Sequence, residues 1–102
     1  MKTRWLAIAV TALALGIAGP AHAAGDKAAG KAKANTCKGC HGKNGEGVKN
    51  NGPSLAKLSE AQIAKALSDY KSGARTSKRM APVVKKLSSS DIANLAAYWG
   101  SL

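Results

Sequence analysis

The C-terminal half of the chain contains two segments in which apolar residues recur at helical spacing. The stripes are Ile63, Ala66, Leu67 and Tyr70 in the first segment and Ile92, Leu95, Ala96 and Trp99 in the second. Ser59 and Gln62 form a capping-box pattern before the first stripe. Ser88 and Asp91 repeat that signal before the second. The pattern predicts a helix over residues 60–72 and a last helix that closes the chain.

The remaining segments combine one further helical signal with irregular stretches. Residues 26–36 are rich in Ala and Lys, and Asp26 lies where a helix dipole favours an anion. They predict a first helix that runs into Cys37. Five glycines between residues 39 and 52 predict an irregular loop, and the basic stretch 72–82 predicts another. Runs of β-branched and aromatic residues are absent, so we expect an all-α fold with about three main helices.

The N-terminus has the form of a secretory signal peptide. Lys2 and Arg4 precede a mostly apolar run of thirteen residues, 5–17, and small residues follow it. As a helix this run reaches about 20 Å, which is shorter than a hydrocarbon core of about 30 Å. We therefore predict that residues 1–23 are removed near Ala23, leaving one domain over 24–102 in the periplasm. The alternative is an uncleaved membrane anchor.

Composition limits what this domain can be. The 102 residues carry a net charge of +11, contain four aromatic residues and lack Phe, so side chains alone supply a small core. We expect a bound group to complete it. Cleavage near Ala23 leaves fourteen basic and five acidic side chains, spread along the chain. This distribution indicates a solvated surface, and export argues against a nucleic-acid partner.

The run Cys37-Lys38-Gly39-Cys40-His41 is the Cys-x-x-Cys-His pattern of covalent haem attachment. On a helical turn, two cysteines three residues apart project to the same side, so each thiolate can add to one vinyl group of a porphyrin. The following residue, His41, is then placed as the proximal iron ligand. We predict one haem c, bound through Cys37 and Cys40.

Other uses of these residues are less compatible with the sequence. A structural zinc site needs four protein ligands, and the mature chain offers only Cys37, Cys40 and His41. A thioredoxin-like redox pair is typical of a βαβ frame, which the pattern does not predict. A plain disulfide is the remaining alternative.

The sixth iron ligand separates two classes of function. His22 leaves with the signal peptide, so no second histidine is available, and Met80 is the remaining soft neutral ligand. Ligation by Met80 predicts a single-electron carrier that is not itself an enzyme. If Met80 instead fills a gap in the core, the open iron position predicts a gas binder or a peroxidase-like catalyst.

With these residues in place, the chain resembles a class I cytochrome c of the small bacterial periplasmic mono-haem type. The resemblance spans about residues 25–102 and rests on the attachment motif, the downstream Met80 and Gly52-Pro53. It implies that the Pro53 carbonyl accepts a hydrogen bond from His41, which orients the imidazole. The alternative for Gly52-Pro53 is an ordinary turn.

The resemblance also implies that the first and last helices cross. Gly30 is the small residue of that crossing, and Tyr98 or Trp99 is its aromatic partner. Lys33 departs from the family pattern, because a large apolar side chain is usual one turn before the first cysteine. The register of the crossing therefore stays open.

The expected partners of this monomer are redox proteins with acidic docking surfaces. The resemblance implies a cytochrome bc-type complex upstream and a terminal oxidase, reductase or peroxidase downstream. With two propionates and ferric iron, the mature chain carries a charge of about +8. The family exposes one haem edge, which we expect these residues to surround: Lys38, Lys43, Arg75, Lys78, Arg79, Lys85 and Lys86.

Overall fold

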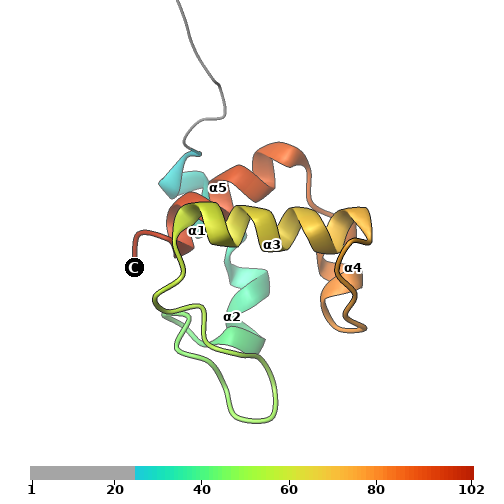
Figure 1. Cartoon of the computed structure of the whole chain (residues 1–102). Coiled ribbons are helices and arrows are strands. Elements are labelled where there is room, and N and C mark those ends of the chain that lie inside the picture. The colour runs from blue at the N-terminus through green and yellow to red at the C-terminus, as the bar shows by residue number, and fades with distance from the viewer. Residues whose placement is uncertain (1–24) are drawn as a thin grey trace, which may run out of the picture.

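The computed structural model describes residues 25–102, which form an all-α fold (Figure 1). The signal-peptide prediction concerns residues outside this range. The helices are α1 (Lys27–Lys33), α2 (Asn35–His41), α3 (Glu60–Ser72), α4 (Met80–Lys85) and α5 (Ser89–Trp99). Between residues 25 and 102 the only extended pairing is an isolated bridge that joins Val48 and Gly52. The predicted fold class is thus confirmed, with five helices where about three were expected.

The two striped segments form helices with the predicted caps. Before α3, the Ser59 hydroxyl accepts a hydrogen bond from the Gln62 N–H at 3.1 Å, and the Gln62 side chain accepts one from the Ser59 N–H at 2.8 Å. A matching reciprocal pair joins Ser88 and Asp91 before α5. Gly73 ends α3 in the left-handed region, with φ of 90°. Local signals therefore account for both boundaries of α3 and for the start of α5.

α1 and α5 pack side by side through a glycine (Figure 1). Gly30 is buried, and a Cβ atom there would collide with the Asn94 carbonyl group and lie 2.9 Å from the Tyr98 Cβ atom. Tyr98, and not Trp99, is therefore the aromatic partner of Gly30. The unusual Lys33 forms an ion pair with Asp91 at 3.5 Å. These contacts establish the register that the sequence left open.

The structure corrects the prediction of one continuous helix from residue 26 to Cys37. α1 ends at Lys33, and α2 begins at Asn35 in a different direction (Figure 1). Between them, the Ala34 carbonyl accepts hydrogen bonds from the Cys37 and Lys38 N–H groups at 2.8 and 3.2 Å. Ala34 is fully buried. The turn at Ala34 separates the helix that packs on α5 from the helix that carries the cysteines.

The prediction of a loop over 72–82 is wrong at its C-terminal end. Met80 is the first residue of α4, where the Ser77 hydroxyl accepts a hydrogen bond from its N–H at 3.1 Å. Pro82 lies in the first turn, where a proline costs no intrahelical hydrogen bond. A six-residue helix is too short to show an apolar period. Val84, which is 2% exposed, anchors α4 to the core.

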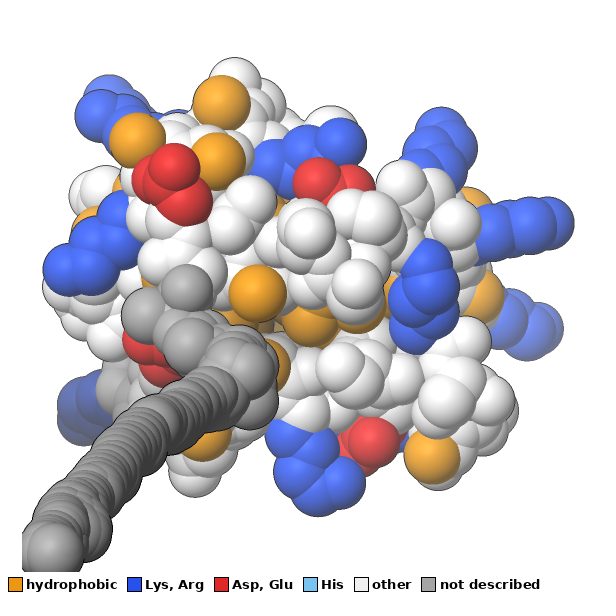
Figure 2. Space-filling model, turned by 90° about the horizontal axis from the view of Figure 1, so that it is seen from above, with side chains coloured by type: hydrophobic (Ala, Val, Ile, Leu, Met, Phe, Trp, Pro, Cys, Tyr) orange, Lys and Arg blue, Asp and Glu red, His pale blue; other side chains and the backbone are white. Residues whose placement is uncertain are grey.

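The core is small and consists mainly of aliphatic side chains. Leu95 and Val84 are its largest fully buried members, and Trp99 also belongs to it, with 4% exposure. Basic side chains lie on several sides of the face shown in Figure 2, with acidic side chains between them. Among residues 25–102, no helix has the length and apolar character required to cross a membrane.

Candidate cofactor site

The thiol and imidazole side chains of α2 line a cavity of about 380 Å³. Cys37, Cys40 and His41 all line it. Met80 reaches the same cavity from α4 and packs against the core. Two thiols, an imidazole and a thioether thus meet at one space from two separate helices.

The walls of the cavity are largely apolar. They are contributed by the 53–58 loop, α3, α4 and α5, and the apolar side chains are Leu55, Leu58, Ile63, Ala66, Leu67, Val83, Leu95 and Trp99. Such walls suit a large flat apolar group and exclude water from it. The small side-chain core described above is completed when this space is filled.

The Pro53 carbonyl group orients His41. The His41 Nδ1 atom lies 2.7 Å from the Pro53 carbonyl oxygen, which can only accept, so Nδ1 carries the proton. The other ring nitrogen, Nε2, is then the one with a free lone pair for a metal ion. Gly52 permits this approach, because a Cβ atom there would collide with the Cys40 carbonyl group and lie 3.1 Å from His41 Nδ1.

The environment of Cys37 distinguishes this site from a reactive thiolate. Burial raises the pKa of the Cys37 thiol above its ordinary value, against the opposing effect of its contact with Thr36. Redox and nucleophilic cysteines show the opposite shift. In the described part of the chain, no three His, Cys, Asp or Glu side chains gather as a metal site. A thioredoxin-like pair would also require a βαβ frame, whereas the regular elements of residues 25–102 are helices.

Trp99 provides a further test of whether a cofactor fits. Its buried indole Nε1 lies near the Cys37 thiol and has no nitrogen or oxygen acceptor among residues 25–102, and the side chain lines the cavity. Sulfur is a weak acceptor, so this buried donor remains available to a polar group of a bound cofactor. The donor set also fits a c-type haem: two thiols that would bond to its vinyl groups, and an imidazole and a thioether that would be available to its iron.

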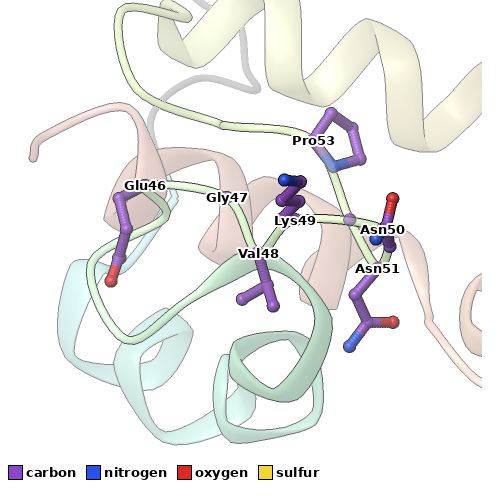
Figure 3. A pocket seen from close by; sticks show the side chains of 8 residues that line it. Glu46, Gly47, Val48, Lys49, Asn50, Asn51 and Pro53 are labelled. Carbon is purple, nitrogen blue, oxygen red and sulfur yellow. The ribbon is translucent and has the colours of Figure 1, made fainter.

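A second hollow lies over the loop of residues 46–53 (Figure 3). In that view the Val48 and Asn51 side chains point to one side of the chain and Lys49 to the other. A local hydrogen bond stabilises the loop: the Glu46 carboxylate accepts it from the Asn44 N–H at 2.8 Å. This hollow belongs to the segment that carries Pro53, and it adds no separate chemistry.

The structure brings all five predicted site residues to one cavity: Cys37, Cys40, His41, Pro53 and Met80. It adds Trp99, which the sequence assigned to an apolar stripe and to the helix crossing. It also adds Asn51 and Arg79, which line the cavity and contact each other. The composition of a glycine-rich and asparagine-rich loop gave no signal for that contact.

The comparisons with known proteins agree with this site. Residues 26–102 match the family described as Cytochrome c. The chain is 46% identical over 89 residues to cytochrome c4 of Pseudomonas aeruginosa, an alignment that covers 87% of this chain and 44% of that protein. It is 38% identical over 104 residues to cytochrome c4 of Azotobacter vinelandii, covering 93% and 50%. The chain thus spans about half the length of these relatives.

A shorter relative aligns over nearly its whole length. Cytochrome c-554(548) of Halomonas halodenitrificans is 38% identical over 81 residues, which cover 76% of this chain and 98% of that protein. The family match, the helical fold and the Cys-x-x-Cys-His motif at an apolar cavity agree with one another. The chain belongs to the cytochrome c family as a class I cytochrome c, with one haem c bound covalently through Cys37 and Cys40.

Proposed function

We propose that this protein is a periplasmic single-electron carrier in which His41 and Met80 are the two axial iron ligands, and that it is not itself an enzyme. The main supporting observation is that an imidazole from α2 and a thioether from α4 line the same apolar cavity. A haem iron bound there supplies reversible one-electron exchange. With both axial positions taken by the protein, the site lacks an open position for a substrate.

The residues around the cavity have separate tasks in this function. Pro53 accepts the Nδ1 hydrogen bond and keeps the His41 ring in one orientation. The Ser77 hydroxyl accepts a hydrogen bond from the Met80 N–H at the start of α4 and thereby positions Met80. The apolar walls keep water away, so little solvent rearranges when the charge of the site changes. Thioether ligation favours the ferrous state relative to a second imidazole and raises the reduction potential.

Absorption spectra of the holoprotein test the proposed ligation. The ferric wild-type protein should show the weak long-wavelength band of iron–methionine ligation. Met80→Ala should abolish this band and lower the potential. Val83→Ala is the matched control, because Val83 lines the same cavity from the same helix without a ligating atom. A band that survives in Met80→Ala would contradict the proposal.

The proposed partners are redox proteins with an acidic surface around their own electron-transfer site. The supporting observation is charge: the segment after the proposed cleavage site has fourteen basic and five acidic side chains. Of the residues proposed to surround the exposed haem edge, Arg75 and Arg79 line the cavity, and Lys78 is exposed between them in sequence. Such rim charges act mainly on the rate of association.

The periplasmic location depends on removal of residues 1–23. N-terminal sequencing of the exported protein should begin at or near Ala24, and its intact mass should equal that of the shortened chain plus one haem. An N-terminus at Met1 would support the anchor instead.

A further inference from the structure

One side chain, that of Asn51, joins α2 to the segment that carries Met80. We call residues 37–53 the proximal segment and residues 73–80 the distal segment. Asn51 donates a hydrogen bond from its side-chain nitrogen to the Gly39 carbonyl oxygen at 3.1 Å. It accepts two from Arg79, one on its backbone oxygen at 2.9 Å and one on its side-chain oxygen. Arg79 directly precedes Met80.

The contact with Gly39 satisfies the end of α2. The last carbonyl groups of a helix have no partner within that helix. Gly39 lies between the two cysteines, and its carbonyl oxygen receives the Asn51 amide. Asn51 therefore caps the helix that holds both attachment sites and His41.

The contact with Arg79 is the stronger part of this bridge. A guanidinium group makes charge-assisted hydrogen bonds, which exceed neutral ones in strength, and here one nitrogen meets two oxygens of the same residue. Both Arg79 and Asn51 line the cavity, so the bridge crosses between its walls. The two residues are 28 positions apart in the sequence.

Apart from the packing of Met80 against the core, this bridge is what holds the distal segment to distant parts of the chain. The other hydrogen bonds of the distal segment are local, for example from the Arg75 N–H to the Asp69 carbonyl oxygen and from the Met80 N–H to Ser77. Arg75 also stacks over the Tyr70 ring at 5.0 Å, five residues away in the sequence. Among the described residues, the hydrogen bonds of Arg79 are the only ones that tie residues 73–80 to a distant part of the chain.

We propose that Arg79 is a positioning residue: through Asn51 it fastens the distal segment to the proximal segment and so decides how firmly Met80 holds its place against a competing ligand. This inference rests on the proposed ligation by Met80. Without the bridge, Met80 remains covalently attached to α4, but the segment before it moves away from the cavity more often. A competing ligand then captures the vacated position at lower concentration.

Imidazole titration of the ferric holoprotein measures this effect directly. Loss of the long-wavelength methionine band reports the displacement of Met80. Arg79→Ala should bind imidazole about fivefold more tightly than wild type, which corresponds to about 1 kcal/mol. Lys78→Ala is the matched control, since it removes the same charge at the neighbouring exposed position and leaves the bridge intact. Its affinity should stay within about twofold of wild type.

Two further variants test the path through Asn51. Asn51→Ala should also tighten imidazole binding, and the double variant with Arg79→Ala should show less than the product of the two single effects, because both act on one bridge. Arg79→Lys keeps the charge and should recover part of the wild-type behaviour. In Arg79→Ala, amide hydrogen exchange over residues 78–81 of the reduced holoprotein should also accelerate.

The possible outcomes distinguish a failure of the proposed role of Arg79 from a failure of the proposed ligation by Met80. Imidazole affinity in Arg79→Ala that equals that of wild type or of Lys78→Ala overturns the role of Arg79. A lower midpoint of thermal unfolding with unchanged imidazole affinity overturns it as well, because a merely structural contact predicts that result. A wild-type protein without the methionine band contradicts the proposed function itself, and this is seen before any variant is compared.

Discussion

The two walls of the cavity are held in different ways. The proximal segment is fixed by dense contacts: His41 Nδ1 meets the Pro53 carbonyl oxygen at 2.7 Å, and the Gly47 N–H donates to the His41 carbonyl oxygen at 2.6 Å. The distal segment has local turns and the Arg79 bridge. We infer that the proximal segment, which carries His41, is rigid and that the distal segment, which carries Met80, is more mobile. Perturbations should therefore act on Met80 before they act on His41.

The largest predicted effect concerns the tight packing of the proximal segment. Gly52→Ala places a Cβ atom against the Cys40 carbonyl group and 3.1 Å from His41 Nδ1. Because the obstacle is backbone, the loop must move, and we expect a loss of about 1 to 3 kcal/mol in the free energy of unfolding. Chemical denaturation of the holoprotein measures it.

Gly39→Ala is the control for that change. A Cβ atom at Gly39 has no heavy atom within 4 Å beyond its own helix, and alanine favours a helix by about 0.5 to 1 kcal/mol over glycine. This variant should be as stable as wild type or more so. Equal losses in Gly52→Ala and Gly39→Ala would contradict the claim that close backbone contact makes the proximal wall rigid.

An intermediate effect is expected on the rate of electron transfer to a physiological partner. Lys78→Glu reverses a charge in the distal segment without breaking the Arg79 bridge, and it should slow association severalfold at low salt. Lys65→Glu is the control, since Lys65 lies on α3 outside the cavity lining and already pairs with Asp69 at 2.8 Å. Stopped-flow rates should fall as salt shortens the Debye length from about 30 Å to about 8 Å. Rates indifferent to salt and to position would indicate that the charges serve solubility alone.

The smallest predicted effect concerns acid. The N–H groups of Glu46 itself and of Asn44 lower the pKa of the Glu46 carboxyl below its ordinary value of 4.5. The ionised form therefore favours the folded loop above about pH 4.5, and this contribution is lost as the pH falls through the lower folded-state pKa. Glu46→Gln should make thermal stability slightly less dependent on pH in that range.

Glu60→Gln is the comparison for the acid prediction, because the Glu60 side chain accepts no hydrogen bond from the residues that the structure describes. Its thermal stability is measured over the same pH range. If both variants follow the wild-type profile, the Glu46 contacts do not contribute to the proximal wall.

Sequence reasoning succeeded where the signals are local. The capping residues and apolar stripes of α3 and α5 lie within or next to each helix, and the attachment motif is five consecutive residues. The structure places Met80 at the same cavity as the motif, but the helix that begins at Met80 was not predicted. α4 forms because Val84 is buried by distant parts of the chain. Burial by distant residues leaves no apolar helical periodicity that could be recognised in a segment of six residues.

Contacts between polar loops were beyond prediction for a related reason. Arg79 was predicted as a docking residue on sequence proximity to Met80, yet its guanidinium group binds Asn51. No periodicity or composition relates two such residues 28 positions apart. Similarly, Tyr98 and Trp99 were equal candidates for the helix crossing. The structure separates them, with Tyr98 against Gly30 and Trp99 at the cavity.

The most direct test of the account is the reaction of the ferrous wild-type holoprotein with carbon monoxide at neutral pH. If Met80 holds the iron position opposite His41, the absorption spectrum should remain unchanged over minutes, whereas that of Met80→Ala should shift at once. Rapid and complete binding by the wild-type protein would contradict the account and favour a gas binder or peroxidase-like catalyst with an open iron position.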